Sequence, residues 1–328
     1  MNIYLRSPYF VINDDNRYRR KRCFFIYVKF KIIILLIFEY IFFLIIIIVS
    51  IEIKNKICIC TLGKEENKYI REFVQYYEKI GVDKIYLYDN NNKKGESFEE
   101  VFEIYIKLGF VEVINWRNKK FPQLKFMNDC YIRNYKKYDW LMFYDIDEYI
   151  NLFGYSNIKY FLNEDKFSKC QLIYLNLIPH NDNNQLYYEN KSLFERFPEK
   201  VSITKPEGMK LEVKFILKGH IPKVRIFNQH YCNHRLKNCN GFGKKNTVHY
   251  IHTYYPDYKY YYIDHFFSKS TEEFIDKIKK GDCRYYKSQR KKKLGRYFNQ
   301  SDITLDKIKM IEKRLKINIY DYINLTNI

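Results

Sequence analysis

Hydrophobic positions follow two regular patterns in the first half of the chain. Short apolar and β-branched runs predict buried strands, and apolar residues at helical spacing predict amphipathic helices between them. Strands that alternate with helices predict a parallel sheet covered by helices. The strands are predicted at residues 56–62, 84–88, 111–116 and 140–144, and the helices at residues 66–80, 98–108 and 123–135.

The second half is less regular. The sequence Ser270-Thr-Glu-Glu273 is a capping box and predicts a helix that runs to Gly281. The basic and aromatic segment 284–296 predicts a solvated connector, and residues 305–315 have the spacing of a terminal helix. Short strands are predicted at residues 171–178, 214–217, 224–227, 247–252 and 260–267.

Residues 32–51 form an almost wholly apolar segment, interrupted by Glu39 and Ser50. About twenty such residues suffice to cross a bilayer as a helix. The preceding residues 1–31 are rich in Lys and Arg, which favours a cytoplasmic N-terminus and a single-pass type II arrangement. An anchor that lies in the membrane interface is the alternative.

The overall charge of the chain bears on which partners it can bind. The 328 residues carry 58 Lys and Arg against 38 Asp and Glu, for a net charge of +20. Such an excess suits nucleic acid, an anionic membrane surface or a phosphorylated substrate. Because the charge is scattered and no recognition motif accompanies it, we do not expect nucleic acid as a partner.

The eight cysteines do not imply a complete disulfide framework. We expect Cys58, Cys60, Cys130 and Cys170 to be thiols of the core, because their neighbours are apolar. For Cys232 and Cys239 three alternatives stay open. They could bridge each other in an oxidising compartment, bind zinc together with His230 and His234, or belong to a polar loop.

The sequence Asp145-Ile-Asp147 carries the candidate chemistry. It directly follows the apolar run 140–144, and residues i and i+2 of an extended chain project to the same side. Two carboxylates placed so can share one hard cation. Ligands of parallel α/β sheets bind beyond the carboxyl ends of the strands, where Asp89 also lies. A solvated acidic turn is the alternative for the pair, and an ordinary turn for Asp89.

All seven histidines lie at or after position 180, so the second half is expected to complete a polar site. His265 follows Asp264 in an aromatic run, and Lys269 comes four residues later. A neutral imidazole at His265 could be a third metal ligand, with Lys269 near phosphate. A buried histidine with a satisfied hydrogen bond is the alternative. The motifs of P-loop ATPases, Rossmann dehydrogenases, zincins and α/β-hydrolases are absent.

Several ordered motifs resemble the GT-A glycosyltransferases, specifically the group of glycosyltransferase family 92 and family 2-like enzymes. The first two are the segments 64–73 and 81–91, although Glu65 and Phe73 replace an Asn and a Trp of the usual opening. The resemblance covers about residues 58–281. The remaining matches are Gln123, Asn128-Asp-Cys130 and Arg133, then Trp140 with Asp145-Ile-Asp-Glu-Tyr149, and finally His265-Phe-Phe-Ser-Lys-Ser-Thr-Glu-Glu-Phe274.

The resemblance implies an α/β fold of the GT-A type, with a Rossmann-like, mostly parallel sheet flanked by helices. It implies an inverting transfer of a hexose, with galactose as the candidate, from a UDP-sugar to a glycan or glycoconjugate, assisted by Mn²⁺ or Mg²⁺. By position, Asp145 and Asp147 would bind the metal and the diphosphate, and His265 would complete the metal shell. Glu66 and Asp89 would line the nucleotide pocket, and Lys269 would approach phosphate. The general base stays unknown.

These expectations combine into one organisation of the chain. Residues 1–31 would be a cytoplasmic tail, 32–51 a transmembrane helix, 56–150 the nucleotide-sugar half, 151–283 the acceptor half and 284–328 a basic connector with a terminal helix. The enzyme would face the Golgi or another lumen in a eukaryote, or reside in the inner membrane of a bacterium. Sequons at Asn190, Asn299 and Asn324 fit a lumenal side. The alternatives are an inactive, membrane-tethered glycan-binding or scaffold protein of the same fold, and a metal-dependent phosphodiesterase.

Overall fold

The structure of the chain is a computed structural model. It divides the chain into two compact units, residues 1–54 and 55–328, which we describe separately. The described residues are 29–42, 55–120, 122–201, 211–232, 235–245, 248–249, 252–253, 259–281, 289–298 and 300–321.

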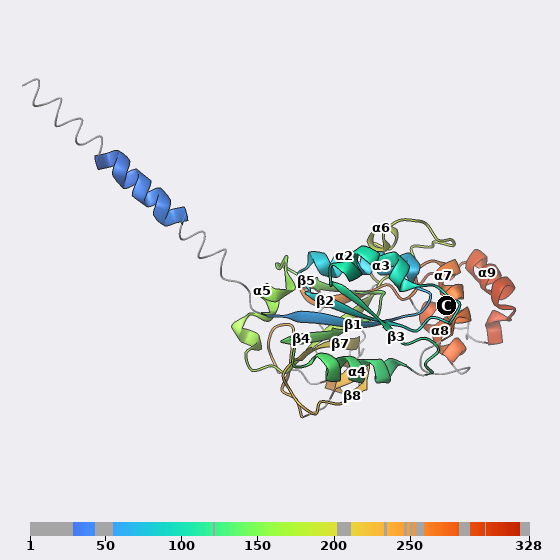
Figure 1. Cartoon of the computed structure of the whole chain (residues 1–328). Coiled ribbons are helices and arrows are strands. Elements are labelled where there is room, and N and C mark those ends of the chain that lie inside the picture. Colours follow the sequence, from blue (N-terminus) through green and yellow to red (C-terminus); the bar gives the residue numbers. More distant parts are fainter. Residues whose placement is uncertain are drawn as a thin grey trace, which may run out of the picture. The chain divides into compact units, whose positions relative to one another are not determined.

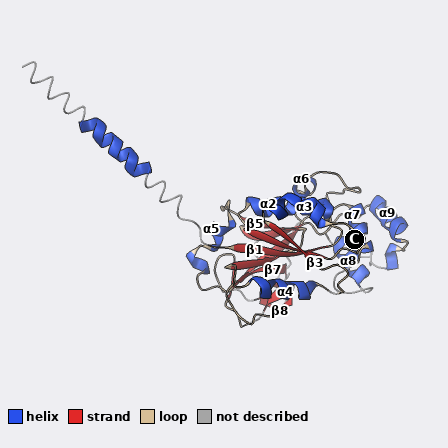
Figure 2. Cartoon of the chain, in the orientation of Figure 1, coloured by secondary structure: helices blue, strands red, loops and turns tan. Residues whose placement is uncertain are grey.

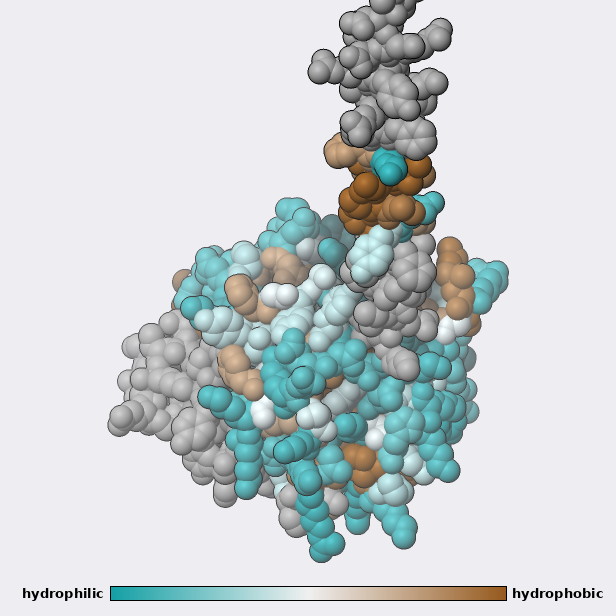
Figure 3. Space-filling model, turned by 90° about the vertical axis from the view of Figure 1, so that its left-hand side faces the viewer, coloured by the Kyte–Doolittle hydropathy of each residue, from teal (hydrophilic) through white to brown (hydrophobic). Residues whose placement is uncertain are grey.

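In the first unit, the described residues 29–42 form a helix with exposed apolar side chains such as Leu35 and Phe38. Figure 3 shows this helix as mainly hydrophobic, whereas the visible face of the second unit is mostly hydrophilic. No helix in the described part of the chain combines the length and the apolar character needed to cross a bilayer. Residues 43–51 of the predicted transmembrane segment lie outside the described residues.

The second unit is built on a sheet with four adjacent parallel strands, in the order β3-β2-β1-β4. All four were predicted from their apolar runs, and β1 and β4 are wholly buried except at Leu62. Figure 2 shows the strands of the sheet between helices. The bounds are β1 Ile57–Gly63, β2 Lys84–Asp89, β3 Val111–Asn115 and β4 Trp140–Phe143.

The helices cover both faces of this sheet, as the alternating pattern predicts. In Figure 1, α2 (Asn67–Lys79) and α3 (Phe98–Lys107) lie on one face and α4 (Gln123–Asn134) on the other. The side of α2 that carries Ile70, Phe73 and Val74 is fully buried, so the predicted apolar stripe is the one that packs on the sheet. The mixed α/β fold expected from the sequence is therefore confirmed for this half.

The second half extends the same sheet with strands of mixed direction, in the order β4-β7-β6-β13-β5. β7 runs antiparallel to β4 and to β6, and β13 runs parallel to β6 and antiparallel to β5. The bounds are β5 Glu148–Leu152, β6 Leu172–Pro179, β7 Leu211–Lys218 and β13 Tyr261–His265, joined by α5 Ile158–Leu162, the 3-10 turn η1 Asp165–Phe167 and α6 Leu193–Arg196.

Two details of the second half differ from the sequence-based expectations. β5 was not predicted, because it follows the acidic turn without a break and only its pairing with β13 identifies it. The run 247–252 is not one strand but two short paired ones. The remaining short strands are β8 Ile226–Asn228, β9 Tyr231–Cys232, β10 Asn238–Asn240, β11 Val248–His249 and β12 His252–Thr253.

The connector expected to be solvated contains a helix, α8 (Gln289–Phe298), with Leu294 and Tyr297 fully buried. Together with α7 (Thr271–Lys279) and the correctly predicted α9 (Leu305–Leu315), α8 forms a separate hydrophobic cluster that includes Phe274 and Ile311. In Figure 1 these three helices gather at the end of the sheet where β1 ends, and a short 3-10 turn, η2 (Ile319–Asp321), follows.

The expectation of core thiols is wrong for three of the four cysteines. Cys60 of β1 is bonded to Cys130 of α4, and Cys170 is bonded to Cys239 of β10. Cys239 therefore does not bridge to Cys232, whose thiol donates to the carbonyl of Arg225. These pairings depend on which helix packs over which strand, which a single sequence does not reveal. Cys58 is the buried thiol that was expected.

Candidate active site

A cavity of about 460 Å³ opens where the parallel strands end at their carboxyl termini. Gly63 and Asp89 are paired at the ends of β1 and β2, and Asp145 follows β4 by two residues. A Cβ atom on Gly63 would lie 2.6 Å from the Phe98 ring, so glycine is needed for this close approach. The topology thus brings the predicted residues to one edge, and the cavity is lined there by Gly63, Asn90, Asp145, Asp147, His265 and Lys277, among others.

Asp89 lies just behind the cavity wall. It is 1% exposed, forms an ion pair of 2.7 Å with Arg117, and accepts a hydrogen bond from the backbone of Asn91. Arg117 also donates to the carbonyls of Asn92 and Glu96. Asp89 therefore fixes the loop after β2, and its neighbours Asn90 and Asn92 face the cavity.

Asp145 is held by residues from both halves of the chain. Its carboxylate lies 2.9 Å from the Lys214 ammonium of β7 and accepts a hydrogen bond from Gln123 at the start of α4. Lys214 is 1% exposed and also lies 2.9 Å from Glu148. Burial disfavours the charged ammonium, but the two carboxylates outweigh it and raise the pKa of Lys214 to about 12.

Asp147 is surrounded by nitrogen atoms from the last residue of β13 and from the segment that follows this strand. Its carboxylate lies 2.8 Å from Lys277, 3.7 Å from Lys269 and 3.7 Å from Nε2 of His265. Burial opposes ionisation, but Lys277 and Lys269 outweigh it and hold the pKa of Asp147 well below its usual value. His265 reaches this place because it is paired with Glu148 across β13 and β5.

The structure does not assemble the predicted metal shell completely. Asp147 and His265 lie side by side, whereas Asp145 is turned to Lys214, and the described residues contain no group of three ligands placed to hold an ion. The chemistry of the donors still suits a divalent cation, since burial lowers the pKa of His265 to about 3 and keeps its ring neutral. Asp147 and His265 thus lie 3.7 Å apart, and their role as metal ligands stays a prediction.

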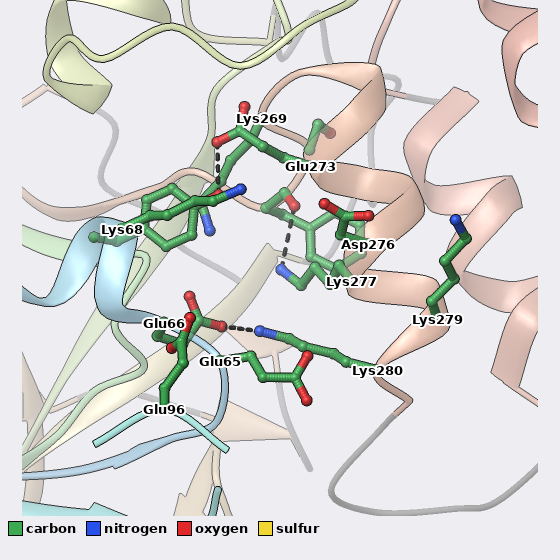
Figure 4. Close-up of a pocket in the computed structure, with 13 residues that line it drawn as sticks. Glu65, Glu66, Lys68, Glu96, Lys269, Glu273, Asp276, Lys277, Lys279 and Lys280 are labelled. Carbon is green, nitrogen blue, oxygen red and sulfur yellow. Dashed lines mark hydrogen bonds and ion pairs between the residues drawn. The ribbon is translucent and has the colours of Figure 1, made fainter. Parts of the chain in front are cut away.

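Glu66 and Lys269 lie in an adjoining hollow, drawn in Figure 4. Glu66 forms an ion pair with Lys280 at the end of α7 and lines both the hollow and the cavity. Lys269 is buried, and its ammonium lies 3.9 Å from the centre of the Tyr69 ring. It lines only the hollow, so it stands behind Asp147 rather than in the cavity.

Sequence reasoning missed several charged residues of this site, among them Lys214, Glu212, Lys277 and Arg296. Lys214 and Glu212 lie on the same face of β7, and Glu212 forms an ion pair of 3.1 Å with Arg296 of α8. The spacing of Lys277 from the capping box could have placed it on α7. Nothing in the sequence shows that this helix faces Asp147.

A family model describes most of this chain. The model for glycosyltransferase family 92 matches residues 54–315, which include every element of the second unit from β1 to α9. This chain belongs to glycosyltransferase family 92.

Curated members of family 92 match a shorter stretch. A family 92 protein of Ricinus communis is 29% identical over 99 residues, which are 30% of this chain and 17% of that protein. One of Oryza sativa subsp. japonica is 30% identical over 101 residues, again 30% of this chain and 17% of that protein. This family 92 chain thus covers about a sixth of the length of these relatives.

Among solved structures, S. aureus TarS in complex with UDP-GlcNAc is similar at 14% identity and a TM-score of 0.35. The match covers 82% of each chain. The complex of TarS with UDP gives 12% identity and the same TM-score, and covers 82% of this chain and 76% of that one. At this level of similarity neither structure enters the arguments below.

Proposed function

We propose that this family 92 member is a glycosyltransferase that moves a hexose from a UDP-sugar to a hydroxyl of a glycan or glycoconjugate. The observation that carries the proposal is the Asp145-Ile-Asp147 turn, which faces a cavity at the carboxyl ends of the parallel strands. The loop after β2 supplies Asn90 and Asn92 to the same cavity, where amide groups can bind a nucleoside. Galactose stays the candidate sugar, on the resemblance of the motifs alone.

The reaction requires that negative charge on the departing diphosphate is compensated. Asp147 and His265 would hold a divalent cation, and Asp145 would join them once it turns away from Lys214. Such a cation would bind the diphosphate oxygens and stabilise the charge that develops on them. In the absence of a cation, Lys214 holds the carboxylates of Asp145 and Glu148 at 2.9 Å beneath the cavity. Burial raises the pKa of Glu148 well above its usual value, and Lys214 opposes that shift.

We also propose a residue for the role of general base. In an inverting transfer, the acceptor oxygen attacks the anomeric carbon, the bond to the diphosphate breaks, and a carboxylate takes the hydroxyl proton. Among the described residues that line the cavity, Glu212 is the one acid from the second half of the chain. We assign it the role of general base, with Arg296 orienting its carboxylate.

The position of the enzyme in the cell is part of the same proposal. The apolar segment 32–51 would anchor the chain as a single-pass type II membrane protein, with the second unit on the lumenal side in a eukaryote. The disulfides Cys60–Cys130 and Cys170–Cys239 support an oxidising compartment such as the secretory pathway.

Sugar transfer from a panel of UDP-sugars to glycan acceptors, detected by mass spectrometry with Mn²⁺ or with EDTA, tests the proposal. We expect Asp147→Asn and Glu212→Gln each to lower kcat at least a hundredfold, with donor binding weakened only in Asp147→Asn. Full activity of Asp147→Asn would refute the assigned site. Absence of any transfer, with UDP-sugar still bound, would favour the inactive glycan-binding alternative.

A further inference from the structure

Lys277 occupies a place in the site that none of the recognised motifs explains. Its ammonium lies 2.8 Å from Asp147 Oδ2 and donates to the carbonyl of Phe267 at 3.2 Å. The side chain lines both the cavity and the adjoining hollow, and about a fifth of it is exposed. The ammonium is therefore within reach of a ligand that enters the cavity.

Two lysines near Lys277, which are Lys280 and Lys269, are held by partners within the protein. Lys280 forms an ion pair with Glu66 and also donates to the carbonyl of Lys64 at 2.9 Å, so it ties the end of α7 to the loop after β1 (Figure 4). Lys269 is 5% exposed and rests on the Tyr69 ring. Of these three lysines, only Lys277 has both access to the cavity and a partner that it can leave.

Asp147 would keep one compensating cation if Lys277 moved. The ammonium of Lys269 remains 3.7 Å from its carboxylate. The lysine stem has four rotatable bonds, so its ammonium can move to a new acceptor while α7 stays in place. A diphosphate also carries more negative charge than a single carboxylate and attracts the ammonium more strongly.

We propose that Lys277 binds the donor diphosphate directly, and that it exchanges Asp147 for a phosphate oxygen when the donor enters. This inference rests on the proposed function, because it takes a nucleoside diphosphate as the occupant of the cavity. The exchange moves a positive charge onto the leaving group and at the same time opens Asp147 Oδ2 to a cation. Lys277 thereby acts on donor binding directly, whereas Lys269 lies beside Asp147 and lines only the hollow.

The same helix offers a matched control. Lys279 lies two residues further along α7 and is exposed, and Figure 4 shows it away from the Glu66–Lys280 pair. Replacing either lysine with Met removes one positive charge from the same helix. A difference between Lys277→Met and Lys279→Met therefore reports the position of the charge and not the net charge.

The test measures binding of UDP and of uridine to the purified chain of residues 1–328, by ligand-observed NMR and calorimetry, in EDTA and in Mn²⁺. In EDTA we expect Lys277→Met to weaken UDP binding about tenfold to a hundredfold, the range for one charge-assisted hydrogen bond. Uridine binding should not change, Lys277→Arg should recover most of the UDP affinity, and Lys279→Met should resemble the wild type. If Lys277→Met does not fold, Lys277→Gln carries the same test, since its amide can still contact Asp147.

Two results would overturn the inference alone: unchanged UDP affinity in Lys277→Met, or an equal loss of UDP and uridine binding, which would indicate a structural role. A wild-type chain that binds UDP neither with nor without Mn²⁺ would overturn the proposed function, and the inference with it. These outcomes are distinguishable because the first two require a wild type that binds UDP.

Discussion

At the scale of single residues, the site depends on one buried ammonium. Lys214 is shared by Asp145 and Glu148, and both Lys214 and Glu148 are 1% exposed. Removing one partner of such a group leaves uncompensated buried charge, which costs far more than the intact arrangement contributes. The contacts that position Asp145 therefore also stabilise the folded state.

We expect Lys214→Met to lower the free energy of unfolding by about 3–5 kcal/mol, because the buried carboxyl groups of Glu148 and Asp145 then lose the ammonium that both contact. Urea unfolding followed by circular dichroism measures the change. The control is Lys237→Met, at an exposed position, which should change the free energy by less than about 0.5 kcal/mol. An equal effect of the two substitutions would contradict the account of Lys214.

The sequence predicted the position of a site residue correctly where the order of strands in the sheet is enough to place it. Asp89 and Asp145 follow predicted parallel strands, so the hydrophobic pattern of the chain was enough to place them at a common edge. The partners of those acids could not be inferred in the same way, because Lys214 and Lys277 come from elements whose place in the fold depends on long-range packing. The role of Lys269 in phosphate contact stays a prediction.

At the scale of elements, α7 is fixed to the rest of the molecule by its own capping residue. Glu273 closes the predicted capping box with Ser270, and its carboxylate also accepts hydrogen bonds from Tyr69 of α2 and Arg196 of α6. Burial raises the pKa of Glu273, but the hydrogen bonds from Arg196, Ser270 and Tyr69 outweigh it and lower the pKa below 4.5. One side chain thus joins three helices.

This arrangement predicts a dependence of stability on pH. Because the pKa of Glu273 is lower in the folded state than in the unfolded state, its contribution is complete above about pH 4.5 and is lost as the pH falls through the folded value. We expect Arg196→Met to lower the free energy of unfolding by about 3–5 kcal/mol at pH 7, and by less below pH 4.5. Urea titrations between pH 3 and pH 8 measure both.

The control is the neighbouring pair, in which Arg314 lies 2.9 Å from the partly exposed Glu272. Arg314→Met should cost less than about 1 kcal/mol at pH 7. A difference between wild type and Arg196→Met that stays constant down to pH 3 would show that Glu273 is not the titrating group.

Elements were predictable where hydrophobic periodicity is strong. The helices α2, α3, α4 and α9 and the four parallel strands lie within two residues of their predicted bounds. The helix α8 was missed because its many Lys and Arg residues obscure the three apolar positions that it buries, Leu294, Tyr297 and Phe298. β5 was missed because an antiparallel strand that begins inside an acidic turn has no boundary signal of its own.

At the scale of the whole molecule, two covalent links cross the fold. Cys60–Cys130 joins a central strand to the helix over it and closes a loop of 70 residues, and Cys170–Cys239 closes one of 69. The match of the family model over residues 54–315 confirms the predicted family, and the matched residues include α8 and α9.

We expect the double variant Cys60→Ala with Cys130→Ala to lose about 2–4 kcal/mol of unfolding free energy, because the unfolded chain gains conformational freedom. Its unfolding midpoint in urea, measured with and without dithiothreitol, tests this. Reduction should lower the midpoint of the wild type more than that of the variant, which retains only Cys170–Cys239. Midpoints that are insensitive to dithiothreitol in both proteins would show that these cysteines are not bonded.

The cluster formed by α7, α8 and α9 has a practical consequence for anyone who shortens this chain for expression. In the sequence, the segment beyond residue 283 is basic, contains no recognised motif and lies far from Asp145 and Asp147. It could therefore be mistaken for a part that the site does not need. Yet α8 delivers Arg296 to Glu212, and α9 inserts Lys307 against the buried Asp182. A boundary drawn at residue 283 would remove a wall of the cavity along with the tail, and the shortest fragment worth purifying extends through residue 321.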